Sequence, residues 1–370
     1  MSTENIDKVN EDVEEIEGLG KDEDDSLGEY PIDTLLIRNE TRTVHDVLRR
    51  IDKGAFVMDP DFQRDFIWSD DKQSKLIESV LMRIPLPVFY LGEDDQGRMI
   101  VVDGLQRLST FDRFVKNKLR LKLSNQIDLD KKFFQDLSPK LQNRIEDCNL
   151  ILYIIDSKVP ERARLDIFER VNGGVPLTRQ QMRNCLYNGK ATRFLKSEAE
   201  RELFKKATGR SLKNQSMRDR EFVNRFCAFH LLPIEDYKDD MDDWLALALK
   251  KMNKLNEEDL HSLSLQFQNS LQNNYCLFRD HAFRKHTPGQ NRRSVLNASL
   301  WDVMITGLAK YSHDQVQSHA EQLKNQYYKL INDEKFVWSI TYGPNSPDRV
   351  RHRFEETQKM LEGVFNAYSS

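Results

Sequence analysis

The sequence predicts an α+β protein, in which a mixed α/β domain is followed by a larger all-helical domain. Three short apolar runs in the first half have the length and the side chains of buried strands, at Val88–Leu91, Met99–Val102 and Leu150–Ile155. From Pro160 onward such runs stop, and apolar residues recur at the spacing of amphipathic helices. The expected division is an acidic disordered tail over residues 1–30, the α/β domain over 31–158 and the helical domain over 159–370.

Length and composition are those of a globular protein. With 370 residues, of which 39% are hydrophobic and 31% charged, the chain is long enough to bury a sizeable core. The longest apolar runs are far too short to span a bilayer, and the acidic N-terminus lacks the pattern of a secretory signal. The four cysteines lie far apart, which favours reduced thiols over zinc or disulfides. We therefore expect a cytoplasmic protein.

Charge is distributed unevenly along the chain. Residues 1–30 contain twelve Asp and Glu residues and two lysines, a net charge of −10. Because the whole chain carries −4, residues 31–370 carry +6. A block of like charges is usually solvated and disordered, and we expect this of the tail, although it could also compete for a basic surface elsewhere on the protein.

Polar residues mark where helices begin. Thr43 is placed to cap a helix over Val44–Ile51, and Ser69, followed by two aspartates, to start one that runs to about Arg83. Thr178, with a glutamine three positions later, has the spacing of a capping box. Further long amphipathic stretches lie over residues 217–231, 239–253, 257–281, 293–311, 313–331 and 347–366.

The best candidate for chemistry is Asp103-Gly104-Leu105-Gln106-Arg107, where a buried strand ends and a helix begins at once. The first turn of that helix exposes unpaired N–H groups and the positive end of the helix dipole, which together suit an anion. Arg107 could add a bidentate phosphate donor, Gln106 could orient a water or a phosphate oxygen, and Asp103 could hold magnesium or accept a proton. Alternatively, Asp103 caps the helix, Gly104 makes the turn and Arg107 pairs with a surface carboxylate.

Four segments in order resemble a known family. They are Phe62–Trp68, Leu76–Leu81, Ile84–Pro87 and Val101–Thr110, and they resemble the N-terminal domain of the GmrSD-type restriction endonucleases, which has a ParB/sulfiredoxin-like fold. The usual family motif is Asp-Gly-Gln-Gln-Arg, and here Leu105 replaces the first Gln. The resemblance continues through Phe168–Leu177, Arg183-Asn184, Asn297–Trp301 and Arg353-Phe354, over about residues 33–360, as in members that consist of this module alone.

The resemblance implies nucleotide binding and hydrolysis at the motif, and a role in defence against foreign, modified DNA. It makes Asp103, Gly104, Gln106 and Arg107 the nucleotide loop, with a nucleoside triphosphate and magnesium as cofactors and Asp103 as the metal ligand. The resemblance also places Arg64 at this site as a second phosphate ligand and Gln63 as a polar neighbour. Arg170 and Asn172 are expected to close the site from the helical side. Trp68, in contrast, is expected to be a packing anchor.

Many fused relatives carry an HNH-type nuclease domain, for which this sequence has no match. His230 lacks an acidic neighbour and a second histidine at suitable spacing, and His281 and His286 lie in a basic loop. Three clusters of basic residues could contact a nucleic-acid phosphate backbone, or they could be ordinary solvated helix surfaces. They consist of Lys205, Lys206, Arg210, Lys213, Arg218 and Arg220, of Arg284, Lys285, Arg292 and Arg293, and of Arg349, Arg351 and Arg353.

Three functions are compatible with these observations. The leading hypothesis is a nucleotide-binding, NTP-hydrolysing component of DNA restriction or anti-phage defence. The alternatives are a DNA nuclease that uses the same loop, and a non-catalytic DNA-binding or partner-binding module. The expected partners are DNA and a partner nuclease or modification enzyme, without a membrane.

Overall fold

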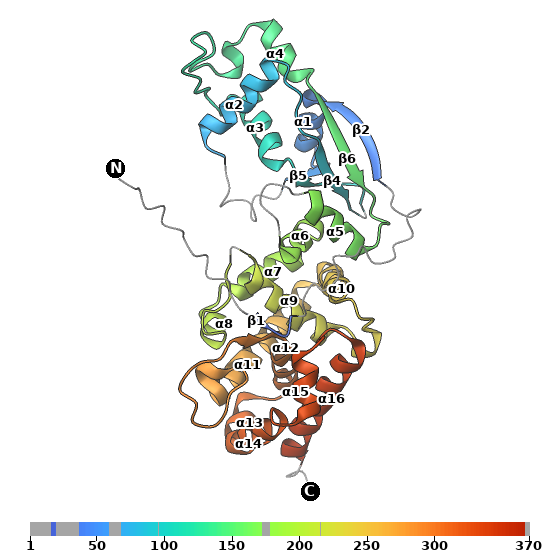
Figure 1. The fold of residues 1–370 in the computed structure, drawn as a ribbon, viewed down its shortest axis with the longest axis vertical. Coiled ribbons are helices and arrows are strands. Elements are labelled where there is room, and N and C mark those ends of the chain that lie inside the picture. Colours follow the sequence, from blue (N-terminus) through green and yellow to red (C-terminus); the bar gives the residue numbers. More distant parts are fainter. Residues whose placement is uncertain are drawn as a thin grey trace, which may run out of the picture. The chain divides into compact units, whose positions relative to one another are not determined.

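The computed structural model describes residues 16–19, 37–58, 68–94, 96–171, 178–214 and 216–366. They form two compact units (Figure 1), which we describe separately. The sheet unit comprises Asp24–Asn188, and the helical unit comprises Gly189–Ser370 together with Met1–Glu23. The prediction of an α+β protein is confirmed, because one unit is built on a sheet with helices and the other is mainly helical.

A five-stranded mixed sheet organises the sheet unit, in the order β2-β6-β4-β5-β3. Its three central strands are the predicted ones, β6 (Asn149–Ile155), β4 (Phe89–Glu93) and β5 (Met99–Asp103). β4 runs parallel to β6 and antiparallel to β5. The sequence does not predict the outer strands, β2 (Ile37–Thr43), antiparallel to β6, and β3 (Phe56–Val57), parallel to β5. β2 is polar and alternates exposed and half-buried residues, so a search for apolar runs misses it.

Four helices of the sheet unit share a core with the sheet. They are α1 (Val44–Asp52), α2 (Asp70–Leu81), α3 (Leu105–Val115) and α4 (Pro139–Glu146). The two predicted caps are confirmed, since the Thr43 hydroxyl accepts from the Asp46 N–H at 3.2 Å and the Ser69 hydroxyl from the Lys72 N–H at 3.4 Å. Apolar faces of these helices and of the central strands form one buried cluster.

Two further helices extend the sheet unit beyond the expected boundary at residue 158. α5 (Glu161–Val171) and α6 (Arg179–Leu186) cluster with the sheet, and the unit ends at Asn188. A Cβ atom built on Gly92 of β4 would lie 3.0 Å from Phe168 and 3.3 Å from Leu186, so both helices pack closely on this strand. Helical periodicity reveals an apolar face but not the surface that covers it.

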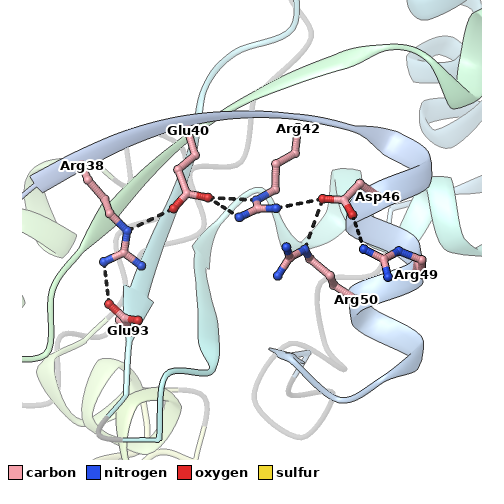
Figure 2. Close-up of polar contacts among 7 residues, drawn as sticks. All are labelled: Arg38, Glu40, Arg42, Asp46, Arg49, Arg50 and Glu93. Atoms are coloured by element: carbon pink, nitrogen blue, oxygen red, sulfur yellow. Dashed lines mark hydrogen bonds and ion pairs between the residues drawn. The ribbon is translucent and has the colours of Figure 1, made fainter.

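The β2 edge of the sheet carries a chain of alternating charges (Figure 2). Arg42 donates to Glu40 on its own strand at 2.5 Å and to Asp46 on α1 at 2.9 Å, and Asp46 also accepts from Arg49 and Arg50. At the other end, Arg38 bonds both Glu40 and Glu93. Charged side chains along an edge strand oppose pairing with another sheet, which is a common protection of exposed edges.

The described part of the helical unit contains ten α-helices. Four 3₁₀ turns lie in the described residues of the two units together. The helices are α7 (Lys190–Ala199), α8 (Glu202–Ala207), α9 (Arg218–Leu231), α10 (Met241–Lys254), α11 (Glu257–Phe278), α12 (Ala298–Gly307), α13 (His313–Ser318), α14 (Ala320–Leu330), α15 (Glu334–Thr341) and α16 (Pro347–Phe365). The 3₁₀ turns are η3 (Phe134–Asp136), η4 (Ile234–Asp236), η5 (Arg279–His281) and η6 (Leu308–Lys310). Aromatic side chains surround the fully buried Trp301, whose indole N–H donates to the Phe222 carbonyl at 2.8 Å.

Two expected helices of this unit have different bounds in the structure. The stretch 293–311 becomes helical only at Ala298, because Asn297 caps α12 by accepting from the Leu300 N–H at 2.8 Å. The stretch 313–331 is divided at His319 into α13 and α14. No helix among the described residues is long and apolar enough to cross a membrane.

The helical unit also contains a small two-stranded sheet, which the sequence does not predict. β1 (Ile16–Glu17) pairs in parallel with β7 (Leu296–Asn297). Residues 16–19 thus have a defined place, although they fall within the acidic segment 1–30 that is expected to be disordered. This segment is placed by contacts with residues about 280 positions later, which local sequence cannot reveal.

Candidate functional site

The turn between β5 and α3 requires a glycine. Gly104 has φ of 103°, a left-handed value that other residues rarely adopt. A Cβ atom at this position would lie 2.3 Å from Cδ1 of Phe89, which is too close for any side chain. The first turn of α3 follows directly, and its leading N–H groups have no partner within the helix. The backbone therefore has the conformation that the motif predicts.

Arg107 is buried beneath this turn and supports it. Its guanidinium donates to the backbone carbonyls of Pro87 and Val88, the latter at 3.1 Å, and to Oδ2 of Asp103 at 2.7 Å. The guanidinium carbon also lies 4.2 Å from the centre of the Phe89 ring. Burial lowers the pKa of Arg107, and the charge of Asp103 offsets part of this effect. The guanidinium ties the segment entering β4 to the start of α3.

Asp103 is the accessible member of this ion pair. Its side chain is 36% exposed, against 9% for Arg107. The alternative in which Asp103 caps the helix is not what the structure shows, since Gly104 is the N-cap and no side chain caps α3. The carboxylate that pairs with Arg107 is Asp103 itself, four residues earlier.

Gln106 connects the loop to the segment that precedes α2. Its Oε1 accepts from the Trp68 N–H at 3.1 Å, and the Trp68 carbonyl accepts from Nε2 of Gln73 at 2.6 Å. Arg113 in turn donates to Oε1 of Gln73 at 2.7 Å. The Trp68 ring packs against the apolar core, as expected of an anchor. Gln73 and Arg113 lie on two different helices, α2 and α3, so no local sequence pattern indicates that they meet.

The remaining predicted site residues are not brought to the loop by the described contacts. Gln63, Arg64 and Asn172 lie outside the described residues. Arg170 is exposed near the end of α5, and no described hydrogen bond joins it to the loop. The structure thus brings Asp103, Gly104, Gln106 and Arg107 together in one loop, and the functional roles of all eight predicted residues stay predictions.

The loop has features that suit a phosphate group with magnesium. Among the residues that the structure describes, no group of three or more His, Cys, Asp or Glu side chains could hold a metal ion by itself. Magnesium bound to a nucleotide needs only one or two carboxylates, because the phosphates and water supply its other ligands. The partly exposed carboxylate of Asp103, beside the N-terminal end of α3, meets that requirement.

Histidines that were weighed as metal ligands have other contacts. His230 stacks on Phe226 with ring centres 5.1 Å apart, and burial lowers its pKa. His281 and His286 stack on each other at 4.9 Å. All four cysteines are free thiols, and burial raises the pKa of Cys148 and Cys227.

The basic clusters of the helical unit are only partly available to an anion. Arg284 and Arg353 are both buried. The guanidinium group of Arg284 donates a hydrogen bond to the Thr208 carbonyl at 2.7 Å. Lys205 and Arg210 both pair with Glu202. A cavity of about 390 Å³ lies beside them, lined by Ala199, Phe204, Lys205, Thr208, Arg210, Leu212, Lys213, Asn214 and Asp219. Three of the nine residues that line this cavity are basic, Lys205, Arg210 and Lys213.

Comparison with known proteins places the loop in a recognised family. Residues 44–188 match the family model described as the GmrSD restriction endonuclease, N-terminal domain. No curated protein and no solved structure matches the chain. This part of the chain is therefore a GmrSD N-terminal domain. The match ends where the sheet unit ends, so the resembling segments at Asn297–Trp301 and Arg353-Phe354 lie outside it.

Proposed function

We propose that this chain is a nucleotide-dependent component of DNA restriction in anti-phage defence. The family match supports the role in restriction, because the matched domain belongs to restriction endonucleases. The observation that carries the nucleotide proposal is the loop after β5, where the left-handed turn at Gly104 starts α3 directly beside the partly exposed carboxylate of Asp103. The proposed ligand is a nucleoside triphosphate with magnesium.

Each described residue of the loop has a distinct proposed role. Gly104 would make the left-handed turn that brings the start of α3 next to Asp103. Arg107 holds Oδ2 of Asp103 and so orients the carboxylate, while its positive charge lies within the same loop. Magnesium, when bound, would neutralise phosphate charge, and Asp103 is the residue that would hold it.

Gln106 extends the proposed site toward the segment before α2. Its bond to the Trp68 N–H links the loop to the end of the segment that contains Gln63 and Arg64. We propose these two residues as further phosphate contacts, with Arg170 and Asn172 closing the site from the α5 side. Gln106 would also position a water for hydrolysis.

Nucleotide binding can be tested with fluorescent ATP and GTP analogues and magnesium. We expect the intact chain to bind one of them, and Asp103→Asn to weaken its binding at least tenfold. Asp112→Asn is a matched control, because Asp112 forms the i, i+4 pair with Lys116 on the same helix, at 2.5 Å. Equally weak binding by the wild type and by both variants would contradict the proposal.

Binding without catalysis is the second candidate. It is favoured by the commitment of the Arg107 guanidinium to backbone carbonyls and of Gln106 Oε1 to a backbone N–H. Measurement of phosphate release, with and without DNA, separates the two candidates. Magnesium-dependent nicking of a plasmid, lost in Asp103→Ala, would instead indicate that the loop cuts DNA.

We propose that DNA contacts the helical unit near the cavity lined by Lys205, Arg210 and Lys213. Lysine and arginine bind phosphates without regard to sequence, and each lost contact reduces the dependence of affinity on salt. We expect Lys213→Glu to weaken duplex binding and to lower the slope of log affinity against log salt. Lys329→Glu, at an exposed position on α14, is the control.

A further inference from the structure

A short piece of the acidic N-terminal region lies against the helical unit. β1 adds to β7 as a parallel strand, with Ile16 opposite Leu296 and Glu17 opposite Asn297. In Figure 1, β1 lies beside α12, and its residues also contact that helix. The helical unit contacts residues 16–19 through both their side chains and their backbone.

The carboxylate of Glu17 is recognised by two donors. Oε1 accepts a hydrogen bond from the ammonium group of Lys285, and Oε2 accepts from Nδ2 of Asn297 at 3.3 Å. Both charged side chains are about 70% buried, with exposed fractions of 30% for Glu17 and 28% for Lys285. Partial burial strengthens such a charge-assisted contact. A residue of opposite charge at position 17 would be rejected.

The site has room for Gly18 because glycine has no side chain. Its φ is +78°, and a Cβ atom would lie 3.0 Å from the Ile340 carbonyl oxygen and 3.2 Å from the Ser299 N–H nitrogen. Both neighbours are backbone atoms of ordered helices, which cannot move aside as a flexible side chain can. A larger residue here is therefore excluded both by conformation and by space.

Backbone contacts complete the recognition. The Ser299 hydroxyl donates to the Gly18 carbonyl at 3.3 Å, and Nδ2 of Asn345 donates to the Leu19 carbonyl at 3.0 Å. The segment is thus held by its main chain at two carbonyls and by one acidic side chain. Together these features define a motif, an extended residue followed by Glu and Gly.

The groups that bind the segment are held in place independently of it. Asn297 caps α12 through its Oδ1 and donates from Nδ2 to the Ile340 carbonyl at 3.1 Å. Lys285 donates to the Thr341 hydroxyl at 2.7 Å. These contacts lie within residues 285–345, so the site is formed by the helical unit itself. A preformed site of this kind accepts a peptide at little cost of rearrangement.

We propose that the helical unit carries a binding site for a short extended peptide with a Glu-Gly pair, and that residues 16–19 of this chain occupy it in cis. The flanking sequence is rich in Asp and Glu, which matches the cationic Lys285. The site engages only four residues, and a two-residue strand pair is too short to be stable alone, so the segment exchanges with free peptide. This proposal does not depend on the nucleotide function.

The test uses the full chain with its own segment disabled by Glu17→Arg and Gly18→Val. A fluorescein-labelled peptide of residues 12–24 is titrated with this disabled chain and with the wild type, and fluorescence anisotropy is measured. We expect at least tenfold tighter binding to the disabled chain, because in the wild type the cis segment competes. A labelled peptide that carries only Gly18→Val should bind at least tenfold more weakly.

Equal binding to the two chains, or equal binding of the two peptides, would overturn the proposal. The comparison of peptides needs no change in the receptor, so it holds even if a receptor variant unfolds. A charge exchange locates the contact: in a chain disabled by Gly18→Val alone, Lys285→Glu should abolish binding of the native peptide and restore binding of a Glu17→Lys peptide. Lys329→Glu in the same background should change neither affinity.

Discussion

Two carboxylates in this protein are each held by buried arginine, and they have opposite surroundings. Asp302 of the helical unit is fully buried, and it accepts from Arg225 at 2.6 and 2.8 Å and from Arg353 at 3.1 Å. Among the described residues, Asp103 of the sheet unit accepts from the single guanidinium of Arg107, and it keeps 36% of its side chain exposed. Burial lowers the pKa of Arg353 to about 10, against the opposing effect of Asp302.

The difference shows how the same pair of residue types can be fully enclosed in one unit and remain accessible to solvent in the other. Asp302 has no surface left for a ligand, and it neutralises two guanidinium groups inside the core. Asp103 is oriented by Arg107 but still faces outward at a glycine turn. A carboxylate of the first kind should matter for folding, and one of the second kind for ligand binding.

The largest expected effect is that of Asp302→Asn. Two buried guanidinium groups would lose their counter-charge, so the free energy of unfolding should fall by about 3–5 kcal/mol. Urea unfolding followed by tryptophan fluorescence measures this. Asp314→Asn, at an exposed position on α13, is the control, and a loss no larger than in that variant would contradict the structural role of Asp302.

Gly104→Ala should be the next most damaging change. Strain at φ of 103° and the close approach to Phe89 should together cost about 2–4 kcal/mol. Gly54→Ala is a matched comparison, because Gly54 has φ of +71° and no atom within 4 Å of a built Cβ. There, only the strain of about 1–2 kcal/mol applies. Equal unfolding free energies for the two variants would contradict the proposed crowding at the loop.

Asp46 provides an intermediate case, a carboxylate that is 28% exposed within a partly buried network (Figure 2). Hydrogen bonds from Arg49, Arg42 and Arg50 hold the pKa of Asp46 well below its ordinary value. Because the pKa is lowered in the folded protein, the stabilisation from these hydrogen bonds is complete above the unfolded-state pKa of about 4. It is lost as the pH falls below that value toward the folded-state pKa. We expect Asp46→Asn to cost about 1–2 kcal/mol at pH 7.

The pH dependence of that variant is the sharper measurement. The difference in unfolding free energy between the wild type and Asp46→Asn should be constant above about pH 5 and shrink below about pH 4. Asp52→Asn on the same helix removes a single pair with Lys116 and should change stability by less than about 1 kcal/mol. A difference that grows on acidification would show that the network does not act as described.

The smallest effect on stability is expected for Asp103→Asn. Arg107 would keep its two carbonyl acceptors, so the loss should be about 1 kcal/mol or less. The same variant is expected to lose nucleotide binding at least tenfold, whereas Asp302→Asn tested below its unfolding midpoint should retain it. Thermal unfolding and nucleotide titration on one preparation compare the effects of each variant on stability and on binding. If Asp103→Asn lost as much stability as Asp302→Asn, the two carboxylates would not differ in role as described.

Local sequence was sufficient where the determining interactions are local. Thr43 and Ser69 cap their helices because a hydroxyl reaches an N–H three residues later, and Gly104 permits its turn because it lacks a Cβ atom. The three central strands are predictable because each contains a short continuous apolar run, which holds even for β6, where Ile151 on one face is 42% exposed. The family motif could likewise be found without any structure.

Only the tertiary structure decided which partners the remaining groups meet. The polar strand β2 is recognisable only through its pairing with β6, and the placement of residues 16–19 depends on β7 some 280 positions away. Helical periodicity showed that α5 has an apolar face, but not that this face covers β4. The direction of the Arg107 guanidinium, toward the carbonyls of Pro87 and Val88, was equally hidden. Sequence determines what a group can bond, whereas chain-distant neighbours determine what it does bond, because burial and hydrogen bonding act through space.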